Sequence, residues 1–332
     1  MAEDVEPLKL GFIGAGEMAT WAVYPALHLA PIALRAVCDL DEARAKSVAA
    51  RFGAGRWYTD YRRMWAQEDL EALVVQMHPG PRHSIVLEAL EAGYHVFIPK
   101  PPATSLAGTI ELAKAARRAN RTLMVNFQRR FSFGVTRARK IIATPAFGRL
   151  TQVLCSSCSG TYGGARGRHH ADAVQAYLLD FAVHHLDLAR WLGGEVAKLA
   201  VFHQTIDDGI ALALALEFRG GAVGSLQLNS QRVWHRNYDR IEITGQGEYV
   251  VLDGLWTFKH YTGDRNSFSE NYSDERSGEL TGDGPALVEF VEAIREGREP
   301  IASIADSVET MRLLQAILEA VEEGRDGVIR TV

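Results

Sequence analysis

The sequence has 332 residues, of which 47% are hydrophobic and 23% are charged, which is enough chain for about two domains of roughly 100–200 residues each. Its net charge of −5 and its pI near 6.1 provide no basic field that would attract nucleic acid or an anionic membrane. The longest apolar run, near Ile210–Phe218, is far shorter than the roughly 20 residues of a membrane span. Because Met1–Lys9 also lacks a signal-peptide pattern, we expect a cytoplasmic protein with neither a nucleic-acid nor a membrane partner.

The first third of the chain alternates short apolar runs with helical patterns, which is typical of a parallel sheet wound with helices. The predicted strands are Leu8–Ile13, Leu34–Cys38, Ala72–Gln76, His95–Ile98 and Thr122–Asn126. The predicted helices run from the first strand to about Leu29 and over Ala43–Phe52, Pro81–Ala92 and Leu106–Asn120. This rhythm predicts an α/β Rossmann domain over residues 1–125.

Beyond about Phe127 the rhythm changes to β-rich runs separated by turn pairs such as Gly220-Gly221. The predicted strands are Leu150–Ser159, Val196–Gln204, Ile210–Phe218, Ala222–Leu228, Arg240–Thr244 and Tyr249–Asp253. The predicted helices are Phe133–Ile142, about Ala171–Leu192, Pro285–Glu296 and Asp306–Glu323. Strands joined by short turns favour a largely antiparallel open sheet, so we expect an α+β domain over residues 126–332 whose C-terminal helix is able to pack back on the first domain.

Cysteine and histidine pairs raise the question of a metal site. Cys155 and Cys158 have CxxC spacing, but positions three apart on a strand point to opposite faces, and no second CxxC completes four ligands. The pairs His169-His170 and His184-His185 are dense in potential ligands, yet the chain has no HExxH spacing. We therefore expect no metal.

The turn after the first predicted strand has the GxGxxA pattern of a dinucleotide-binding loop, formed by Gly14, Ala15, Gly16, Glu17, Met18 and Ala19. The first glycine permits the tight turn, the second lets a pyrophosphate approach the backbone, and the alanine keeps helix and strand close. The N–H groups at the start of the following helix would face the phosphates. The pattern lies between a predicted strand and a predicted helix, which distinguishes it from an ordinary turn.

Asp39 follows the second predicted strand, near the offset of roughly 20 residues expected for a ribose ligand. Its carboxylate would accept hydrogen bonds from the adenosine ribose and would repel a 2′-phosphate, which favours NAD over NADP. Arg44 lies a few residues further on and would soften that repulsion.

Lys100 lies in the segment Ile98-Pro99-Lys100-Pro101-Pro102, at the C-terminal end of the fourth predicted strand. Ligands of doubly wound sheets bind at that edge, and the flanking prolines restrict the backbone that aims the ammonium group. The alternative is a solvated lysine in a proline-rich loop.

A second candidate group lies on the predicted helix that contains Asp180, His184 and Asp187. Spacings of four and three residues place the three on one helix face, and a polar stripe on an otherwise apolar helix costs desolvation unless it is paired or used. A carboxylate beside an imidazole forms an acid/base unit. The alternative is a solvated stripe on a half-exposed helix.

The glycine-rich loop that begins at Gly160 lacks the GK[ST] ending of a P-loop and is interpreted as a substrate loop. Arg166 and His169 would meet an anionic substrate group, and the aromatic rings of Tyr162 and Trp234 would suit a sugar ring. The alternatives are exposed loop charges without a specific partner and plain packing of the aromatic residues.

Taken together, these segments resemble the family that groups glucose–fructose oxidoreductase, inositol 2-dehydrogenase and MocA-type proteins (Gfo/Idh/MocA), over nearly the whole chain. The matching motifs are GFIGAGEMA, AVCDLDEARA, HPGPRHSIVLEAL, GYHVFIPKP, NFQRRF, DFAVHHLD and RIEITGQGEYVVLDG. The resemblance implies an NAD(P)-dependent oxidoreductase that transfers a hydride between a secondary alcohol of a sugar or polyol and the nicotinamide. It also implies that the open face of the second sheet packs in a homodimer or homotetramer.

The resemblance further assigns the catalytic roles to Lys100, Asp180 and His184, and it places Met77, Pro79, His83 and Asn126 around the nicotinamide half of the cofactor. Pro99 is a departure, because the family's usual residue before the lysine is glutamate, and proline supplies neither a carboxylate nor an N–H group. Two alternatives within the family are a glycoside-cleaving enzyme that retains its NAD and a non-catalytic NAD-binding regulator.

Overall fold

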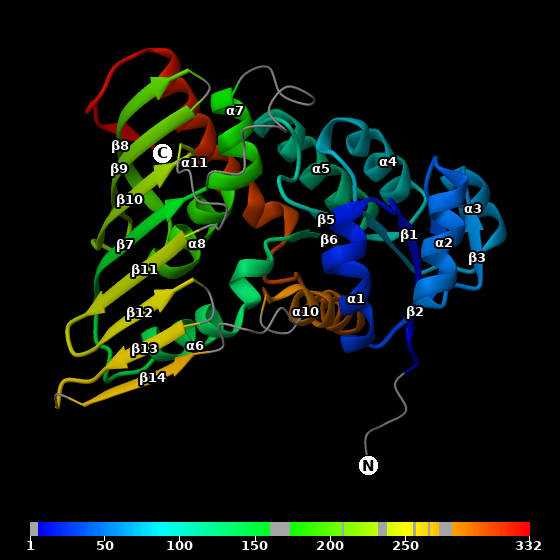
Figure 1. The fold of residues 1–332 in the computed structure, drawn as a ribbon, viewed down its shortest axis with the longest axis horizontal. Helices are drawn as coiled ribbons and strands as arrows, with labels where there is room; N and C mark the ends of the chain where they lie inside the picture. The colour runs from blue at the N-terminus through cyan, green and yellow to red at the C-terminus, as the bar shows by residue number, and fades with distance from the viewer. Residues whose placement is uncertain are drawn as a thin grey trace. The chain divides into compact units, whose positions relative to one another are not determined.

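A computed structural model describes residues 6–159, 173–207, 209–231, 238–254, 257–264, 266–271 and 281–332 of the protein (Figure 1). The chain forms two compact units. The first comprises Met1–Gln128 and Ser277–Val308, and the second comprises Arg129–Arg276 and Glu309–Val332. The polypeptide therefore passes from the first unit into the second, returns to the first and then continues into the second again.

The first unit is built on a six-stranded sheet in the order β3-β2-β1-β4-β5-β6, in which all neighbours are parallel. The strands are β1 (Leu8–Ile13), β2 (Ile32–Cys38), β3 (Arg56–Tyr58), β4 (Ala72–Val75), β5 (His95–Pro99) and β6 (Leu123–Asn126). This order is that of a Rossmann domain and confirms the predicted α/β class. The edge strand β3 was not predicted, because its three residues include two exposed ones and show no apolar run.

Helices cover this sheet. They are η1 (Ala19–Val23), α1 (Tyr24–Ala26), η2 (Leu27–Leu29), α2 (Glu42–Phe52), α3 (Tyr61–Gln67), α4 (Pro79–Glu91), α5 (Leu106–Ala119) and α10 (Asp283–Glu296). Of these, α2, α3, α4 and α5 each begin at a residue whose side chain caps the helix. The Asp41 side chain caps α2 by accepting a hydrogen bond from the Arg44 N–H, and Ser105 caps α5 in the same way from Gly108. The element η1 is a π-helix directly after the glycine loop.

The returning segment packs within the first unit. Phe290 of α10 lies 5.4 Å from the Phe97 ring of β5, measured between centroids, and a side chain at Gly284 would collide with Leu29. The Val125 N–H donates to the Ala302 carbonyl. Residues from the far end of the chain thus complete the core of the first unit beside β6.

The second unit contains a nine-stranded sheet in the order β14-β13-β12-β11-β7-β10-β9-β8-β15. Its strands are β7 (Leu150–Cys158), β8 (Val196–Ile206), β9 (Gly209–Phe218), β10 (Val223–Asn229), β11 (Tyr238–Gly245), β12 (Tyr249–Asp253), β13 (Thr257–Tyr261), β14 (Ser267–Asn271) and β15 (Arg330–Thr331). All neighbours are antiparallel except β7 and β10. The predicted largely antiparallel sheet is therefore confirmed, whereas β13 to β15 were not predicted.

The described helices of this unit lie on one face of the sheet, and none of them covers the other face, which is called the open face here (Figure 1). The helices of this unit are α6 (Phe133–Ile142), α7 (Ala173–Tyr177), the π-helix η5 (Leu178–Ala182), α8 (Val183–Gly193) and α11 (Ile304–Glu322), which starts in the first unit. On β9 the covered face carries Leu212 and Leu214, whereas the open face carries the small residues Ala211 and Ala213. Within the described residues, no helix has the length and apolar character needed to cross a membrane.

Candidate active site

The glycine loop is shaped by a close approach of two strands at the C-terminal edge of the first sheet. Gly14 has φ +103°, and a Cβ there would lie 2.2 Å from the Gln76 carbonyl oxygen, so only glycine fits. A Cβ at Gly16 would meet no described protein atom within 4 Å. The space beside Gly16 is therefore open to a ligand, as the pyrophosphate of a dinucleotide requires.

The residues after the loop separate into a buried and an exposed set. Ala19 is buried against the sheet, whereas Glu17 and Met18 are exposed, with 61% of Met18 accessible. The Thr20 N–H donates to the Gly16 carbonyl, which starts the helical turn. The small Ala19 side chain thus lets η1 pack closely on the sheet, as the GxGxxA pattern predicts.

Asp39 is held at the end of β2 by backbone donors from both sides. Its Oδ2 accepts a hydrogen bond of 2.7 Å from the Ala15 N–H, and its Oδ1 accepts one of 2.9 Å from the Asp41 N–H. Arg44 Nη1 lies 3.7 Å from the same Oδ1. The carboxylate is therefore fixed beside the glycine loop, with remaining lone pairs to accept ribose hydroxyls.

Replacing Asp39 by serine is expected to lower the preference for NAD over NADP, expressed as the ratio of the two kcat/KM values, by about 10- to 100-fold. The carboxylate then no longer repels a 2′-phosphate, and Arg44 remains to pair with one; the range corresponds to about 1.5–3 kcal/mol for hydrogen bonds to a charged group. The matched control is Asp41→Ala, which removes the cap of α2 but should leave the ratio unchanged. An unaltered ratio in Asp39→Ser would exclude Asp39 as the specificity residue.

Four further predicted residues lie in the segments that follow β4 and β5. Met77 precedes α4, Pro79 begins it, and Lys100 directly follows β5, with a cis Lys100–Pro101 peptide bond. The His83 Nε2 lies 2.9 Å from Glu111 Oε2 on α5. These positions all belong to the C-terminal edge of the parallel sheet, which is the ligand-binding edge of a Rossmann domain.

Arg82 is a buried residue of this edge that the sequence analysis missed. Its guanidinium donates to the carbonyls of Met77, Pro101 and Pro102, so it ties the loop after β4 to the segment that follows Lys100. Burial lowers the pKa of Arg82 to about 9. Its burial could have been predicted from its spacing to Ile85, because an arginine three residues before a buried position of an amphipathic helix lies on the apolar face.

The second unit carries Asp180 and His184 on the consecutive elements η5 and α8. His184 is 7% exposed and Asp180 is half-buried. The continuous helix predicted here instead contains a π-helical turn over Leu178–Ala182. Such turns are rare and occur frequently at functional sites.

The neighbouring His185 points to a different, fully buried cluster. Its Nε2 lies 2.6 Å from Asp239 Oδ1, Arg129 Nη1 lies 3.1 Å from Asp239 Oδ2, and Ser157 donates to the same carboxylate. The positive charge of Arg129 and the hydrogen bonds to Asp239 hold the pKa of its carboxyl well below the usual value. This cluster fixes α8 against β7 and β11.

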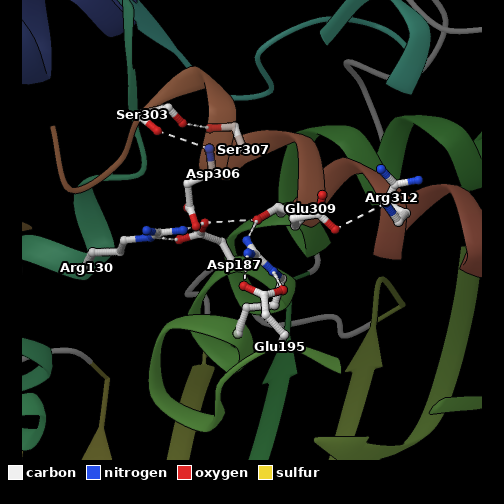
Figure 2. A network of polar contacts seen from close by, with 10 residues as sticks. Arg130, Asp187, Glu195, Ser303, Asp306, Ser307, Glu309 and Arg312 are labelled. Atoms are coloured by element: carbon white, nitrogen blue, oxygen red, sulfur yellow. Dashed lines mark hydrogen bonds and ion pairs between the residues drawn. The ribbon is translucent and has the colours of Figure 1, made fainter. Parts of the chain in front are cut away.

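Asp187 was grouped with Asp180 and His184 on one helix face, but the structure gives it another partner. Figure 2 shows its carboxylate facing the Arg130 guanidinium, with Nε–Oδ2 and Nη2–Oδ1 distances of 2.8 and 2.5 Å. Both side chains are 1% exposed. Asp187 is therefore a structural residue of the second unit. The predicted substrate residues Tyr162, Arg166, His169 and Trp234 lie outside the described residues.

Two family models together match most of the chain. Residues 8–127 match the model of an oxidoreductase family with an NAD-binding Rossmann fold, and residues 135–251 match that of the GFO/IDH/MocA C-terminal domain. The chain belongs to the Gfo/Idh/MocA family. The predicted family, fold class, oxidoreductase activity and NAD-binding domain are thereby confirmed.

Relatives of this Gfo/Idh/MocA protein extend over nearly its whole length. It is 23% identical to myo-inositol 2-dehydrogenase of Thermotoga maritima, covering 96% of this chain and 97% of the relative. It is 25% identical to D-xylose 1-dehydrogenase (NADP(+)) 2 of Haloferax volcanii, with 96% and 98% covered. The crystal structure of a dehydrogenase from Chromobacterium violaceum has a TM-score of 0.88 at 25% identity and covers 96% and 97% of the two chains.

Proposed function

We propose that this Gfo/Idh/MocA oxidoreductase transfers a hydride between NAD and a secondary alcohol of a sugar, polyol or sugar derivative. The observation that carries the proposal is the glycine loop, whose free space at Gly16 and fixed carboxylate at Asp39 suit the pyrophosphate and ribose of NAD. The full-length relatives named for inositol and D-xylose oxidation support the substrate class. No observation on the described residues favours glycoside cleavage or a non-catalytic role.

NAD, when bound, supplies the carbon that accepts the hydride, and the side chains of this chain prepare the substrate. His184 takes the hydroxyl proton as general base. Asp180 orients and polarises the imidazole, which stabilises the protonated ring that results. Lys100 donates a hydrogen bond to the substrate oxygen and stabilises its developing negative charge. In the reverse direction His184 returns the proton to the alkoxide.

The cofactor is assigned to residues of the first unit. Its pyrophosphate would lie along the loop of Gly14, Gly16, Glu17, Met18 and Ala19, and its adenosine ribose would contact Asp39 with Arg44 nearby. The ends of β5 and β6 and the segments that follow β4 and β5 would line the nicotinamide half through Met77, Pro79, His83, Pro99, Lys100 and Asn126. Because Pro99 has no acidic side chain, the lysine lacks the adjacent carboxylate that is usual in the family.

The assembly and location of the protein are further parts of the proposal. The open face of the second sheet carries small side chains on β9 and the exposed Phe202 on β8. Small residues allow this face to approach a second sheet closely, so we assign it to a homodimer or homotetramer contact. We assign the enzyme to the cytoplasm. Sedimentation of the purified protein would test the assembly.

The test is an incubation of the pure protein with NAD and a panel of sugars, inositols and sugar acids, followed at 340 nm. A substrate-dependent rise that is lost in Lys100→Ala and His184→Ala supports the proposal. Tight NAD binding by calorimetry without a rise for any candidate would contradict it and favour cleavage with a retained cofactor or a sensor.

A further inference from the structure

A buried amide at the end of β6 lies beside the lysine segment of the first unit. Asn126 is the last residue of β6 and pairs in parallel register with Pro99, the residue before Lys100. It is 6% exposed. Its position therefore combines burial with the sheet edge at which Rossmann domains bind their ligands.

The orientation of this amide is set by an acidic residue from the returning segment. The Asn126 Nδ2 donates a hydrogen bond of 2.9 Å to Asp283 Oδ1, and both residues belong to the first unit. Asp283 is itself 6% exposed, and its other oxygen accepts a hydrogen bond of 3.1 Å from Thr281 Oγ1. A carboxylate only accepts hydrogen bonds, so it selects the NH₂ end of the amide and turns the carbonyl end away.

The position of Asp283 in part offsets the cost of burying the carboxylate that makes this selection. It is the first residue of α10, where free N–H groups and the helix dipole stabilise negative charge. Burial raises the pKa of Asp283, and the hydrogen bonds from Asn126 and Thr281 oppose that rise.

The carbonyl end of Asn126 is left without a donor. Within the described residues, Asn126 Oδ1 is buried and accepts no hydrogen bond. A buried acceptor without a hydrogen-bond partner lowers the stability of the fold by roughly 1–3 kcal/mol. At a ligand-binding edge, a hydrogen-bond donor of the ligand would remove this cost.

The order of the strands indicates which part of NAD supplies that donor. Asp39, which suits the adenosine ribose, directly follows β2 on one side of β1, whereas Asn126 ends the edge strand β6 on the other side. The glycine loop that suits the pyrophosphate follows β1, between them. NAD that binds across the C-terminal ends of these strands therefore has its nicotinamide near β6. The NH₂ group of the nicotinamide carboxamide is a hydrogen-bond donor, and it is the one available to Asn126.

We propose that Asp283 is a positioning residue, which holds the Asn126 carbonyl oxygen as the acceptor for the carboxamide NH₂ of NAD. The proposal rests on NAD binding to the first unit and on the cofactor direction given above. It assigns a cofactor-orienting role to a residue 157 positions away in sequence from the strand it serves.

The test compares two ligands, NAD and ADP-ribose, by calorimetry, because ADP-ribose lacks the nicotinamide. Asp283→Leu should weaken NAD binding by about 3- to 10-fold, the equivalent of one net hydrogen bond, and leave ADP-ribose binding unchanged. Asp283→Asn replaces the acceptor-only carboxylate by an amide that can also donate to Asn126 Oδ1, so it should likewise weaken NAD binding and leave ADP-ribose binding unchanged. Equal weakening of NAD and ADP-ribose in Asp283→Leu would overturn the proposal.

A double-variant cycle with Asn126→Ala separates positioning from a general effect on the fold. In the Asn126→Ala background, Asp283→Leu should cause no further loss of NAD affinity, because the amide that it positions is gone. An additive loss of NAD affinity in the double variant would overturn the proposal. Wild-type NAD affinity in the single variant Asn126→Ala would overturn it as well, and this variant can be measured even if Asp283→Leu does not fold. These binding results are independent of turnover, so they hold or fail separately from the proposed dehydrogenase activity.

Discussion

Replacing His184 by alanine is expected to lower kcat by about 10²- to 10⁴-fold, the usual contribution of a positioned general base. The imidazole is buried and follows the π-helical turn that carries Asp180, so water would not replace it in the same geometry. NAD affinity should change little, because the glycine loop and Asp39 belong to the first unit. The expected result is thus a loss of kcat with an unchanged Kd for NAD.

The measurement is steady-state turnover at 340 nm with the substrate found in the panel, together with calorimetry of NAD. The matched control is His203→Ala, which removes an imidazole on β8 of the second unit that is also paired with a carboxylate, that of Asp326. This control should keep the wild-type kcat. Wild-type turnover in His184→Ala would remove His184 from the mechanism.

Much of the first unit could be predicted from the sequence because its signals are local. Apolar runs followed by capped helices give the βα rhythm, and Gly14 and Asp39 occupy positions set by the turn and the strand that precede them. The misses in this unit are also local in origin. The strand Arg56–Tyr58 is short and mostly exposed, and the helix Tyr61–Gln67 has a single buried residue, Met64, so neither shows an apolar pattern.

Contacts between residues far apart in the sequence could not be predicted in this way. Asp187 shares a helix face with His184 by spacing, yet its partner Arg130 precedes it by 57 residues. The bond between Asn126 and Asp283 joins residues 157 apart. Periodicity shows which face a side chain occupies but not what lies opposite, so an acid/base group and a structural ion pair look alike. The catalytic assignments of Lys100, Asp180 and His184 remain predictions for that reason.

Asp187→Ala is expected to lower the free energy of unfolding by about 3–5 kcal/mol, the usual cost of removing one member of a buried ion pair. Arg130 would keep its charge while 1% exposed, with two of its donors deprived of the carboxylate. A third hydrogen bond would be lost as well, because Thr310 Oγ1 on α11 donates to Asp187 Oδ1 at 3.2 Å. The variant should therefore be destabilised far more than a surface substitution, which is usually within about 0.5 kcal/mol.

Urea denaturation of the wild type and three variants would measure this effect and identify its cause. If the cost lies in the unpaired guanidinium, the double variant Arg130→Met/Asp187→Leu should recover most of the lost stability, because well-packed apolar residues often replace a buried pair at little cost. The Met side chain would also retain contact with Trp191, whose ring lies 5.0 Å from the Arg130 guanidinium carbon. The matched control is Glu309→Ala, which removes an exposed ion pair with Arg312 on the same helix α11 and should cost at most about 1 kcal/mol. A double variant as unstable as Asp187→Ala would instead attribute the loss to packing of α8 rather than to charge.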